Sequence, residues 1–426
     1  MSSKNMTSMS GKRNKENRSL VPRLRFPEFQ SIGEWKVEPL RKFAVRSTEK
    51  NTNGEHTRVL TNSAEYGVVD QRDYFEKDIA NQGNLEGYYI VEKGDYVYNP
   101  RVSMTAPVGP ISKNNVGTGV MSPLYTVFRF ANSDNNFFAH YFKSTHWHHY
   151  MRKSSSTGAR HDRMSIANDV FMGLPVPVTA PKEQEKITDF LSSLNELIAA
   201  EVQRLDALKV HKQGLIQQLF PQKGETVPYL RFPEFRKAGA WAKVAAGKFF
   251  LNRTERGNSA LPIYSVTMTD GLVPRASLDR RIDDLAKSSA NKAVRKGDIA
   301  YNMMRMWQGA LGVAPEDCMV SPAYIVLEPQ GVNPYFFYFL LKLPQTLQVL
   351  TAHSRGLTED RLRLYYDDFA KVMLLCPSLP EQERIADCLT SIDKLLTIQG
   401  QKVERLKAHK MGLMQQLFPV LDEVHA

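Results

Sequence analysis

Apolar residues recur at alternating spacings of four and three in two segments of the chain, 182–220 and 381–418. The mean spacing, about 3.5 residues, is typical of a coiled-coil seam. In the first segment the apolar positions are Ile187, Leu191, Leu194, Ile198, Leu205, Leu208, Leu215 and Leu219. In the second they are Ile385, Leu389, Ile392, Leu396, Val403, Leu406, Leu413 and Leu417. A proline opens and another closes each segment, so the sequence predicts two long helices, 181–220 and 380–419.

Both seams are interrupted at the same two places, by Glu201 and Lys212 in the first and by Gln399 and Lys410 in the second. A single stripe of this kind is more often the buried face of a core helix. Matched interruptions favour mutual pairing, because each seam otherwise lacks a partner of equal length. We therefore expect an antiparallel coiled coil, with Glu201 near Lys410 or Lys212 near Gln399, and a pseudo-twofold axis relating two globular units at its ends. Each helix would be about 58 Å long at ~1.5 Å per residue.

The two helices end two copies of an internal repeat. Val-Pro-Arg-Leu-Arg-Phe-Pro-Glu-Phe at 21–29 recurs as Val-Pro-Tyr-Leu-Arg-Phe-Pro-Glu-Phe at 227–235, and Gly-Asp-x-x-Tyr-Asn occurs at 94–99 and 297–302. The distance between the copies falls from 206 residues at the first motif to 198 from Gly158 and Gly356 onward. Length therefore varies in the front part of each copy and is constant in the back part.

The front part of each copy consists of short strand-like runs separated by Gly, Pro and Asn, followed by helices that Asp134 and Asn333 are expected to cap. The predicted fold class is α+β, with two tandem-duplicated globular domains joined by two long helices that pair as an antiparallel coiled coil. The predicted boundaries are a disordered basic leader at 1–20, a first domain at 21–180, a helix at 181–220, a second domain at 221–379, a helix at 380–419 and a tail at 420–426.

The composition is that of a soluble globular protein: 42% of the 426 residues are hydrophobic and 24% are charged. Cys318, Cys376 and Cys388 form no Cys-x-x-Cys motif, which favours a reducing cytoplasmic compartment and argues against a thiolate zinc site. The longest aromatic-aliphatic run, 335–341, is far shorter than the ~20 residues that span a bilayer. Much of the net charge of +11 lies in residues 1–25, so a nucleic-acid surface must be a local patch.

Two loops in each copy are candidates for that patch. One is a basic stretch with interleaved aromatic and hydroxyl side chains, whose candidate residues are Lys143, His146, Arg152, Lys153, Ser156, Arg160, His161 and Arg163 in the first copy and Arg355, Arg361 and Arg363 in the second. The other follows the Gly-Asp motif and offers Arg101 and Ser103, or Arg305, Trp307 and Gln308. Arg and Gln side chains can hydrogen-bond base edges in the major groove. Taken singly, each loop is as well explained by an ordinary solvated surface.

Signatures of catalysis are missing from the sequence. Gly247-Lys248 lacks the other residues of a P-loop, and no Gly-x-Gly-x-x-Gly follows a strand. Asn99-Pro100-Arg101 differs from the Asn-Pro-Pro-aromatic motif of adenine methyltransferases that flip their base. His146, His148, His149 and His161 could bind zinc, but without a Cys or a regular acidic partner they are better read as phosphate or base contacts.

The duplicated motifs resemble the specificity subunit of type I restriction–modification systems. The resemblance rests on Leu-Arg-Phe-Pro-Glu-Phe at the start of each copy, Gly-Asp-x-x-Tyr-Asn in the middle, and a proline followed by Glu-Gln-Glu-[Lys/Arg]-Ile at the start of each helix, and it covers 21–419. It implies two target recognition domains that read the two halves of a split, asymmetric DNA site. It also implies that the paired helices, through their seam residues, act as a spacer and docking surface.

The implied partners are double-stranded DNA, two methyltransferase subunits and translocating endonuclease subunits. Chemistry would then belong to the partners, which use S-adenosylmethionine, ATP and magnesium, and this chain would hold no cofactor, no metal and no catalytic residue. Two alternatives remain: a scaffold whose coiled coil only brings proteins together, and a stand-alone DNA-modifying enzyme with degenerate motifs.

Overall fold

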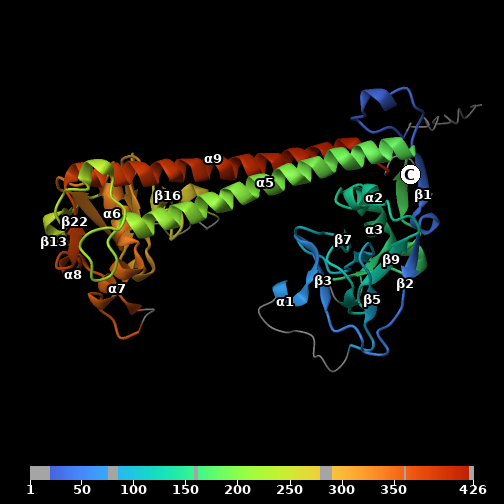
Figure 1. Cartoon of the computed structure of the whole chain (residues 1–426), viewed down its shortest axis with the longest axis horizontal. Helices are drawn as coiled ribbons and strands as arrows, with labels where there is room; N and C mark the ends of the chain where they lie inside the picture. The colour runs from blue at the N-terminus through green and yellow to red at the C-terminus, as the bar shows by residue number, and fades with distance from the viewer. Residues whose placement is uncertain (1–19, 75–84, 158–161, 279–289, 359–360, 422–426) are drawn as a thin grey trace, which may run out of the picture. The chain divides into compact units, whose positions relative to one another are not determined.

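The computed structural model of the chain describes residues 20–74, 85–157, 162–278, 290–358 and 361–421. The predicted leader lies outside the described residues, except for Leu20. The chain divides into two compact units: unit 1 contains residues 1–201 and 402–426, and unit 2 contains residues 202–401. Both boundaries fall inside the long helices, so each unit holds the start of one long helix and the end of the other (Figure 1).

The two units contain equivalent antiparallel sheets. Unit 1 has a four-stranded sheet in the order β2-β9-β6-β7, and unit 2 has one in the order β14-β21-β18-β19. The strands of unit 1 are β1 Lys36–Pro39, β2 Ala44–Ser47, β3 Leu60–Ser63, β4 Gly67–Asp70, β5 Tyr89–Val91, β6 Tyr96–Tyr98, β7 Ile111–Lys113, β8 Gly119–Met121, β9 Thr126–Phe130, β10 Ser156–Thr157, β11 Met164–Ser165 and β12 Pro175–Val178. Those of unit 2 are β13 Ala242–Ala245, β14 Phe250–Asn252, β15 Tyr264–Val266, β16 Leu272–Pro274, β17 Lys292–Val294, β18 Ile299–Asn302, β19 Leu311–Val313, β20 Cys318–Val320, β21 Tyr324–Pro329 and β22 Met373–Cys376. The shared strand order confirms the α+β duplication.

Short helices cover these sheets. In unit 1 they are α1 Gln71–Tyr74, α2 Asn136–Tyr141, α3 His148–Ser154 and α4 Asn168–Phe171, and in unit 2 they are α6 Pro334–Leu341, α7 Pro344–Ala352 and α8 Tyr366–Phe369. Short 3-10 helices are η1 Pro27–Phe29, η2 Leu40–Lys42, η3 Pro233–Phe235, η4 Ala246–Lys248, η5 Arg275–Ser277 and η7 Met306–Gln308. The Asn333 side chain accepts hydrogen bonds from the first backbone N–H groups of α6, as predicted. The predicted Asp134 cap was wrong, because α2 begins one residue later, after Asn135, and has no side-chain cap.

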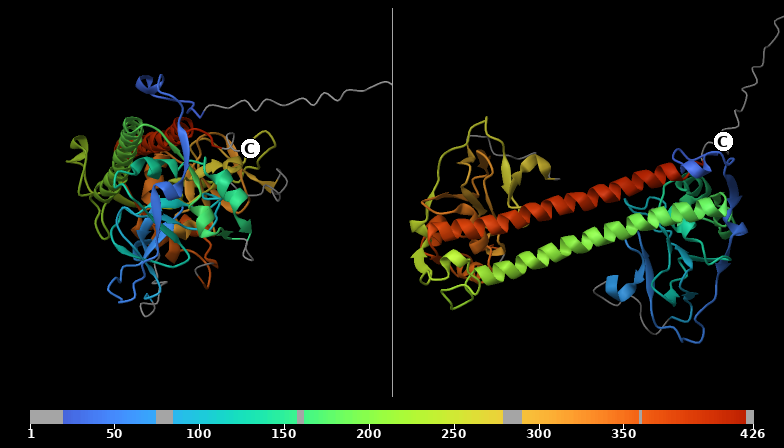
Figure 2. Two further views of the ribbon diagram at one scale, coloured as in Figure 1. Left: turned by 90° about the vertical axis from the view of Figure 1, so that its right-hand side faces the viewer. Right: turned by 45° about the horizontal axis from the view of Figure 1, so that its top comes forward.

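The long helices are α5, Pro181–Leu219, and α9, Leu379–Leu417. In unit 1 the start of α5 lies beside the end of α9, where Lys402 Nζ lies 2.5 Å from Glu201 Oε1 and Lys410 Nζ donates to Asn195 Oδ1 (Figure 1, Figure 2). In unit 2 the end of α5 pairs with the start of α9 through Lys212 Nζ and Asp393 Oδ1, 2.5 Å apart. Within each unit the helices are therefore antiparallel, and every position of both predicted seams is buried or half-buried.

The predicted contacts across the helices, Glu201 with Lys410 or Lys212 with Gln399, were wrong in register. Glu201 pairs with Lys402, Lys410 donates to Asn195, and Lys212 pairs with Asp393. The error is close to one heptad, and it arises because a seven-residue repeat looks the same after a shift of seven residues.

Partial burial and the nearby Lys143 lower the pKa of Lys410 to about 8.

Each aromatic core includes both long helices. In unit 1, Trp35 and Phe137 pack with Phe418, just after the end of α9, and the core continues to Ile187 and Leu191 on α5. In unit 2, Trp241 and Phe336 pack in the same way with Phe220, just after the end of α5. Because each domain core holds residues of both long helices, the helix ends are fixed to the domains that they support.

The repeated Leu-Arg-Phe-Pro-Glu-Phe motif forms a clasp on the first turn of the long helix. In unit 1, Arg25 Nε and Nη2 donate to Glu183 Oε1 and Oε2 at 2.7 and 2.8 Å, and its Nη1 donates to the carbonyl of Ile32 at 2.6 Å. In unit 2, Arg231 makes the same bidentate pair with Glu381 at 2.7 Å for both bonds, and Trp241 Nε1 donates to Glu381 Oε1 at 3.3 Å. Both glutamates are buried, so the motif has a structural role in holding each domain on its helix.

The Asp of the Gly-Asp-x-x-Tyr-Asn motif is also a structural residue. Asp95 is buried and accepts two hydrogen bonds from Arg129, at 2.6 and 2.9 Å. Asp298 is held in the same way by Arg253, at 2.6 and 3.3 Å. The arginine lies on β9 in unit 1 and follows β14 in unit 2, so the two copies fill one structural role from different strands.

Candidate nucleic-acid interface

The Asn that ends the Gly-Asp-x-x-Tyr-Asn motif directs the chain into the first candidate loop. Asn99 Oδ1 accepts a hydrogen bond from the backbone N–H of Arg101 at 3.0 Å, and Asn302 Oδ1 accepts one from Met304 at 3.0 Å. An Asn side chain that bonds two residues ahead reproduces a backbone turn. The motif therefore starts an equivalent loop in both units, 99–110 and 302–310.

In unit 1 the two candidate loops lie side by side. The backbone N–H of Val102 donates to the carbonyl of Asp162 at 3.0 Å, and that of Met164 donates to Pro100 at 2.9 Å. These bonds form an antiparallel bridge between Arg101 and Arg163, which are far apart in the sequence. Arg101 lies 3.6 Å from the Asp162 carboxylate, but both side chains are at least half exposed, so the pair is weak.

In unit 2 the same two loops are joined by the backbone N–H of Leu364, which donates to Met303 at 2.9 Å. Arg355 and Arg363 pair as the two strands of a short ribbon through mutual backbone hydrogen bonds of 2.9 Å. Arg355 is neutralised by Asp368, which binds it at 2.6 Å and raises its pKa. Arg361 and Arg363 are exposed, and in the described part of the chain neither has a carboxylate partner.

The remaining first-loop residues differ between the units. Ser103 is exposed at the loop tip in unit 1. In unit 2, Arg305 is exposed, whereas Trp307 and Gln308 are half-buried in η7, which packs on α7. Trp307 Nε1 donates to the carbonyl of Met304 at 3.2 Å. The backbone positions correspond, but the side chains offered to a ligand do not.

A hollow lies at the base of the loops in each unit. In unit 1 it has a volume of about 450 Å³ and is lined by Arg101, Ser103 and Arg163 together with residues that the sequence did not single out, namely Asn62, Ser63, Gln71, Tyr74, Ser122 and Tyr125. In unit 2 a hollow of about 500 Å³ is lined by Arg355, Arg361 and Arg363 with Met304, Gly356 and Tyr365. Residues such as Gln71 carried no signal in the sequence, because only the pairing of β3 with β4 brings them beside the loops.

The structure divides the predicted basic stretch of unit 1 into two parts. Ser156 lies on β10, where it pairs with Ser165 of β11, and Arg152 is exposed at the end of α3. His146 is buried, and its Nε2 lies 3.2 Å from the carbonyl of Gln415 on α9. Lys143 lies close enough to Lys410 on α9 for its charge to lower the pKa of that lysine. Arg160 and His161 lie outside the described residues.

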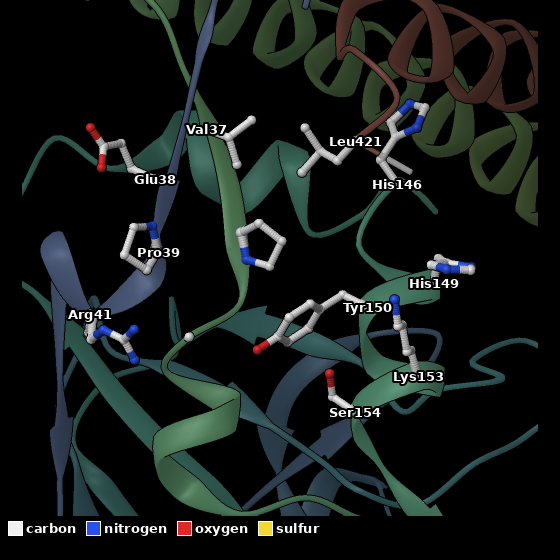
Figure 3. A pocket seen from close by; sticks show the side chains of 12 residues that line it. Val37, Glu38, Pro39, Arg41, His146, His149, Tyr150, Lys153, Ser154 and Leu421 are labelled. Atoms are coloured by element: carbon white, nitrogen blue, oxygen red, sulfur yellow. The ribbon is translucent and has the colours of Figure 1, made fainter. Parts of the chain in front are cut away.

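His146 and Lys153 line a separate groove of about 690 Å³. Figure 3 shows His149, Tyr150 and Lys153 along α3, facing Val37, Glu38 and Pro39, with Leu421 beside His146. Partial burial and the neighbouring Arg152 lower the pKa of His148 to about 4, so this imidazole is neutral at pH 7. His146 and His149 thus line this groove and not the hollow beside Arg101 and Arg163.

Neither a metal centre nor a membrane helix is present in the parts of the chain just described. No group of three or more His, Cys, Asp or Glu side chains there is close enough to hold a metal ion. Among the described helices, none combines the length and the apolarity that crossing a membrane requires. His161 of the predicted histidine group cannot be placed among these residues.

The model of the type I restriction modification DNA specificity domain family matches residues 234–408. The resemblance to type I specificity subunits is confirmed. The chain is similar to the type I restriction enzyme HindI specificity subunit of Haemophilus influenzae, with 28% identity over 144 residues, which are 32% of this chain and 31% of that protein. It is similar to the MjaVIII specificity subunit of Methanocaldococcus jannaschii, with 21% identity over 286 residues, 62% of this chain and 65% of that protein. The alignments thus span less than two thirds of either specificity subunit.

Solved structures of the type I family share the fold. The S subunit of a type I restriction-modification system from M. genitalium has a TM-score of 0.53 at 12% identity, over 93% of this chain and 99% of that chain. A chain from a type I R-M system solved to explain complex assembly and conformational transition has a TM-score of 0.54 at 15% identity, over 90% of this chain and 97% of that chain. At these identities the similarity establishes the fold of the specificity subunits.

Proposed function

We propose that this chain is the DNA-binding specificity subunit of a type I restriction–modification complex and that its two units read the two halves of a bipartite, asymmetric site. One observation carries the proposal. Each unit joins the same two loops by backbone hydrogen bonds, yet the side chains on those loops differ, with the exposed Arg101 and Ser103 and the half-buried Arg163 in one unit and the exposed Arg305, Arg361 and Arg363 in the other. Two domains with equivalent backbone arrangements but different loop side chains suit two half-sites of different sequence.

The charge on the loops supports DNA as the ligand. Arginine can bind two acceptors of one guanine edge, and it also binds phosphate oxygens. Short hydroxyl side chains such as Ser103 and Ser156 add phosphate contacts. Because phosphate contacts release counterions, binding should weaken steeply as salt is raised.

The long helices support a second role, as a spacer and docking surface. Their seam residues are used in helix pairing, so a partner must reach other positions. Exposed apolar residues on the outer faces include Leu197 and Leu395, which occupy equivalent positions in the two copies, and also Ile398 and Val210. Exposed apolar side chains on the helices are candidates for contact with a partner, because covering them would remove apolar surface from water. Two methyltransferase subunits and the endonuclease subunits are the proposed partners.

In this proposal the chain itself is non-catalytic. S-adenosylmethionine, ATP and magnesium are handled by the partner subunits, and this chain only selects the DNA on which they act. Methyl transfer or DNA cleavage by the purified chain without a partner would contradict that division of roles.

The experiment maps methylated adenines in cells that express the chain with a type I methyltransferase subunit, then measures binding of the mapped duplex by the purified complex. The double variant Arg361→Ala with Arg363→Ala should lose the preference for the mapped base sequence in one half-site only. The double variant Arg101→Ala with Arg163→Ala should lose the sequence preference in the other half-site. Each lost base contact should reduce discrimination by about 1–3 kcal/mol.

The matched controls remove exposed positive charge away from the loops. Lys182→Ala on α5 and Lys237→Ala after η3 should leave the preferences of both half-sites unchanged. A wild-type complex with no sequence preference would refute the proposed function. So would loop variants that alter both half-sites equally, because the two units would then not be separate readers.

A further inference from the structure

Two large apolar side chains are fully exposed on the loops that carry the arginines. The accessible areas of Met104 in unit 1 and Leu357 in unit 2 are 102% and 101% of their reference values. Tyr229, at 87%, is the next most exposed large apolar side chain of the described residues. Single exposed apolar residues are common on protein surfaces, so exposure alone assigns no role. The places of these two residues in the fold provide the argument.

Met104 lies at the tip of the first loop of unit 1. The backbone N–H of Ser103 donates to the carbonyl of Ala106 at 3.0 Å, and the N–H of Ala106 donates to Ser103 Oγ at 3.1 Å. These two bonds close a tight turn in which Met104 and Thr105 are the outermost residues. The turn holds the thioether side chain away from the domain core.

Leu357 has the same relation to the second loop of unit 2. It follows Gly356, whose φ of +154° and close approach to the carbonyl of Arg361, 2.6 Å from where a Cβ would lie, leave no room for a side chain. The backbone N–H of Arg361 donates to Thr358 at 2.9 Å. Leu357 is therefore presented at the end of the ribbon formed by Arg355 and Arg363.

The two positions share their chemical surroundings although they come from different loops. Each apolar residue is followed by a threonine, Thr105 or Thr358, and lies within a few residues of an arginine. A two-stranded ribbon fits the major groove of B-DNA. In that groove the one apolar feature of a base edge is the C5-methyl group of thymine.

We propose that Met104 and Leu357 are specificity-determining residues that contact thymine methyl groups, one in each half-site. This inference rests on the proposed function, because it assumes that the loops enter the major groove of a specific site. The arginines would then distinguish guanine, and the apolar tips would distinguish thymine from cytosine or uracil. Each unit would combine the two kinds of contact on one pair of hydrogen-bonded loops.

The test uses the full-length chain in complex with its methyltransferase subunit and the duplex mapped by adenine methylation. Deoxyuridine replaces every thymine of one half-site at a time, so only methyl groups are removed. For the wild type, each replacement should weaken binding about fourfold, the factor for one buried methyl group. Met104→Ala should bind thymine and deoxyuridine equally in its own half-site and keep the fourfold preference in the other. Leu357→Ala should show the reverse pattern.

The controls are Val45→Ala on β2 and Leu251→Ala on β14, which remove exposed apolar side chains at equivalent strand positions away from the loops. Both should retain the wild-type preference in both half-sites. The inference fails if the wild-type complex binds its site but ignores deoxyuridine, if a half-site contains no thymine on either strand, or if the two loop variants keep the preference. A rise in 2-aminopurine fluorescence that depends on Met104 or Leu357 would indicate a wedge between base pairs and would also overturn it. A wild-type complex without sequence preference refutes the proposed function instead.

Discussion

At the scale of single residues, the repeated motifs and the candidate loops differ in their burial and pairing. Arg25 with Glu183 and Arg231 with Glu381 are buried pairs that attach each domain to the start of a long helix. Arg361 and Arg363 on the loops are exposed and have no carboxylate partner among the described residues. Buried charges are tolerated only when they are paired, whereas exposed charges can vary without loss of stability. The two copies therefore keep the clasp and differ in the loops.

The clasp in unit 2 gives a stability prediction. Glu381→Ala leaves the Arg231 guanidinium buried without its carboxylate, which should lower the free energy of unfolding by about 3–5 kcal/mol. The measurement is urea unfolding followed by circular dichroism. Glu383→Ala, which removes an exposed carboxylate two residues away, should change the free energy of unfolding by less than about 0.5 kcal/mol. Equal effects of the two substitutions would show that the clasp does not stabilise the domain.

At the scale of elements, the helix pair has one register out of several that its seam allows. Lys402 with Glu201 and Lys212 with Asp393 indicate the register within unit 1 and unit 2, respectively. The seam pattern alone allows a shift of one heptad. The aromatic residues that follow each helix, Phe220 and Phe418, remove that freedom because they are buried in the domain cores.

The spacer role predicts the effect of shortening both helices together. Deleting 204–210 from α5 and the facing 394–400 from α9 removes one heptad from each and preserves the seam. Each helix shortens by about 10 Å at 1.5 Å per residue, which corresponds to about three base pairs. The gap between the half-sites, measured by mapping methylated adenines, should shorten by about that number while both half-sites stay the same.

A deletion in α5 alone is the control for that experiment. It leaves the two seams unequal in length, so it should reduce stability instead of giving a defined new gap. If the paired deletion left the gap unchanged, the helices would not be the element that sets it.

At the scale of the whole molecule, we expect the two domains to be interchangeable because they share a sheet topology and a clasp. The sheets have the same strand order, and the clasps bind the same glutamate of each long helix. Replacing 227–376 by a second copy of 21–178 should therefore fold and should read two copies of one half-site. Methylation mapping should then find a symmetric site with the original gap. An unchanged asymmetric site would contradict the assignment of one half-site to each unit.

Part of this organisation was predictable from the sequence because it is periodic or local. The repeat and the 3.5-residue spacing predicted two α+β copies and two long paired helices, and Asn333 was recognisable as a cap from its place before Pro334. The error at Asp134 has the same local origin, since the next residue, Asn135, is also of a type that favours helix starts, and helix starts are defined only to within a residue or two.

Only the tertiary structure decided what depends on segments far apart in the chain. It placed Arg101 beside Arg163, buried His146 against α9, and selected one register for the helices. Backbone hydrogen bonds between loops and the burial of a side chain against another element leave no periodic trace in the sequence. Repetition along the chain thus determined the duplicated domains and the paired helices. Packing between distant segments determined which side chains of those domains are accessible to a ligand.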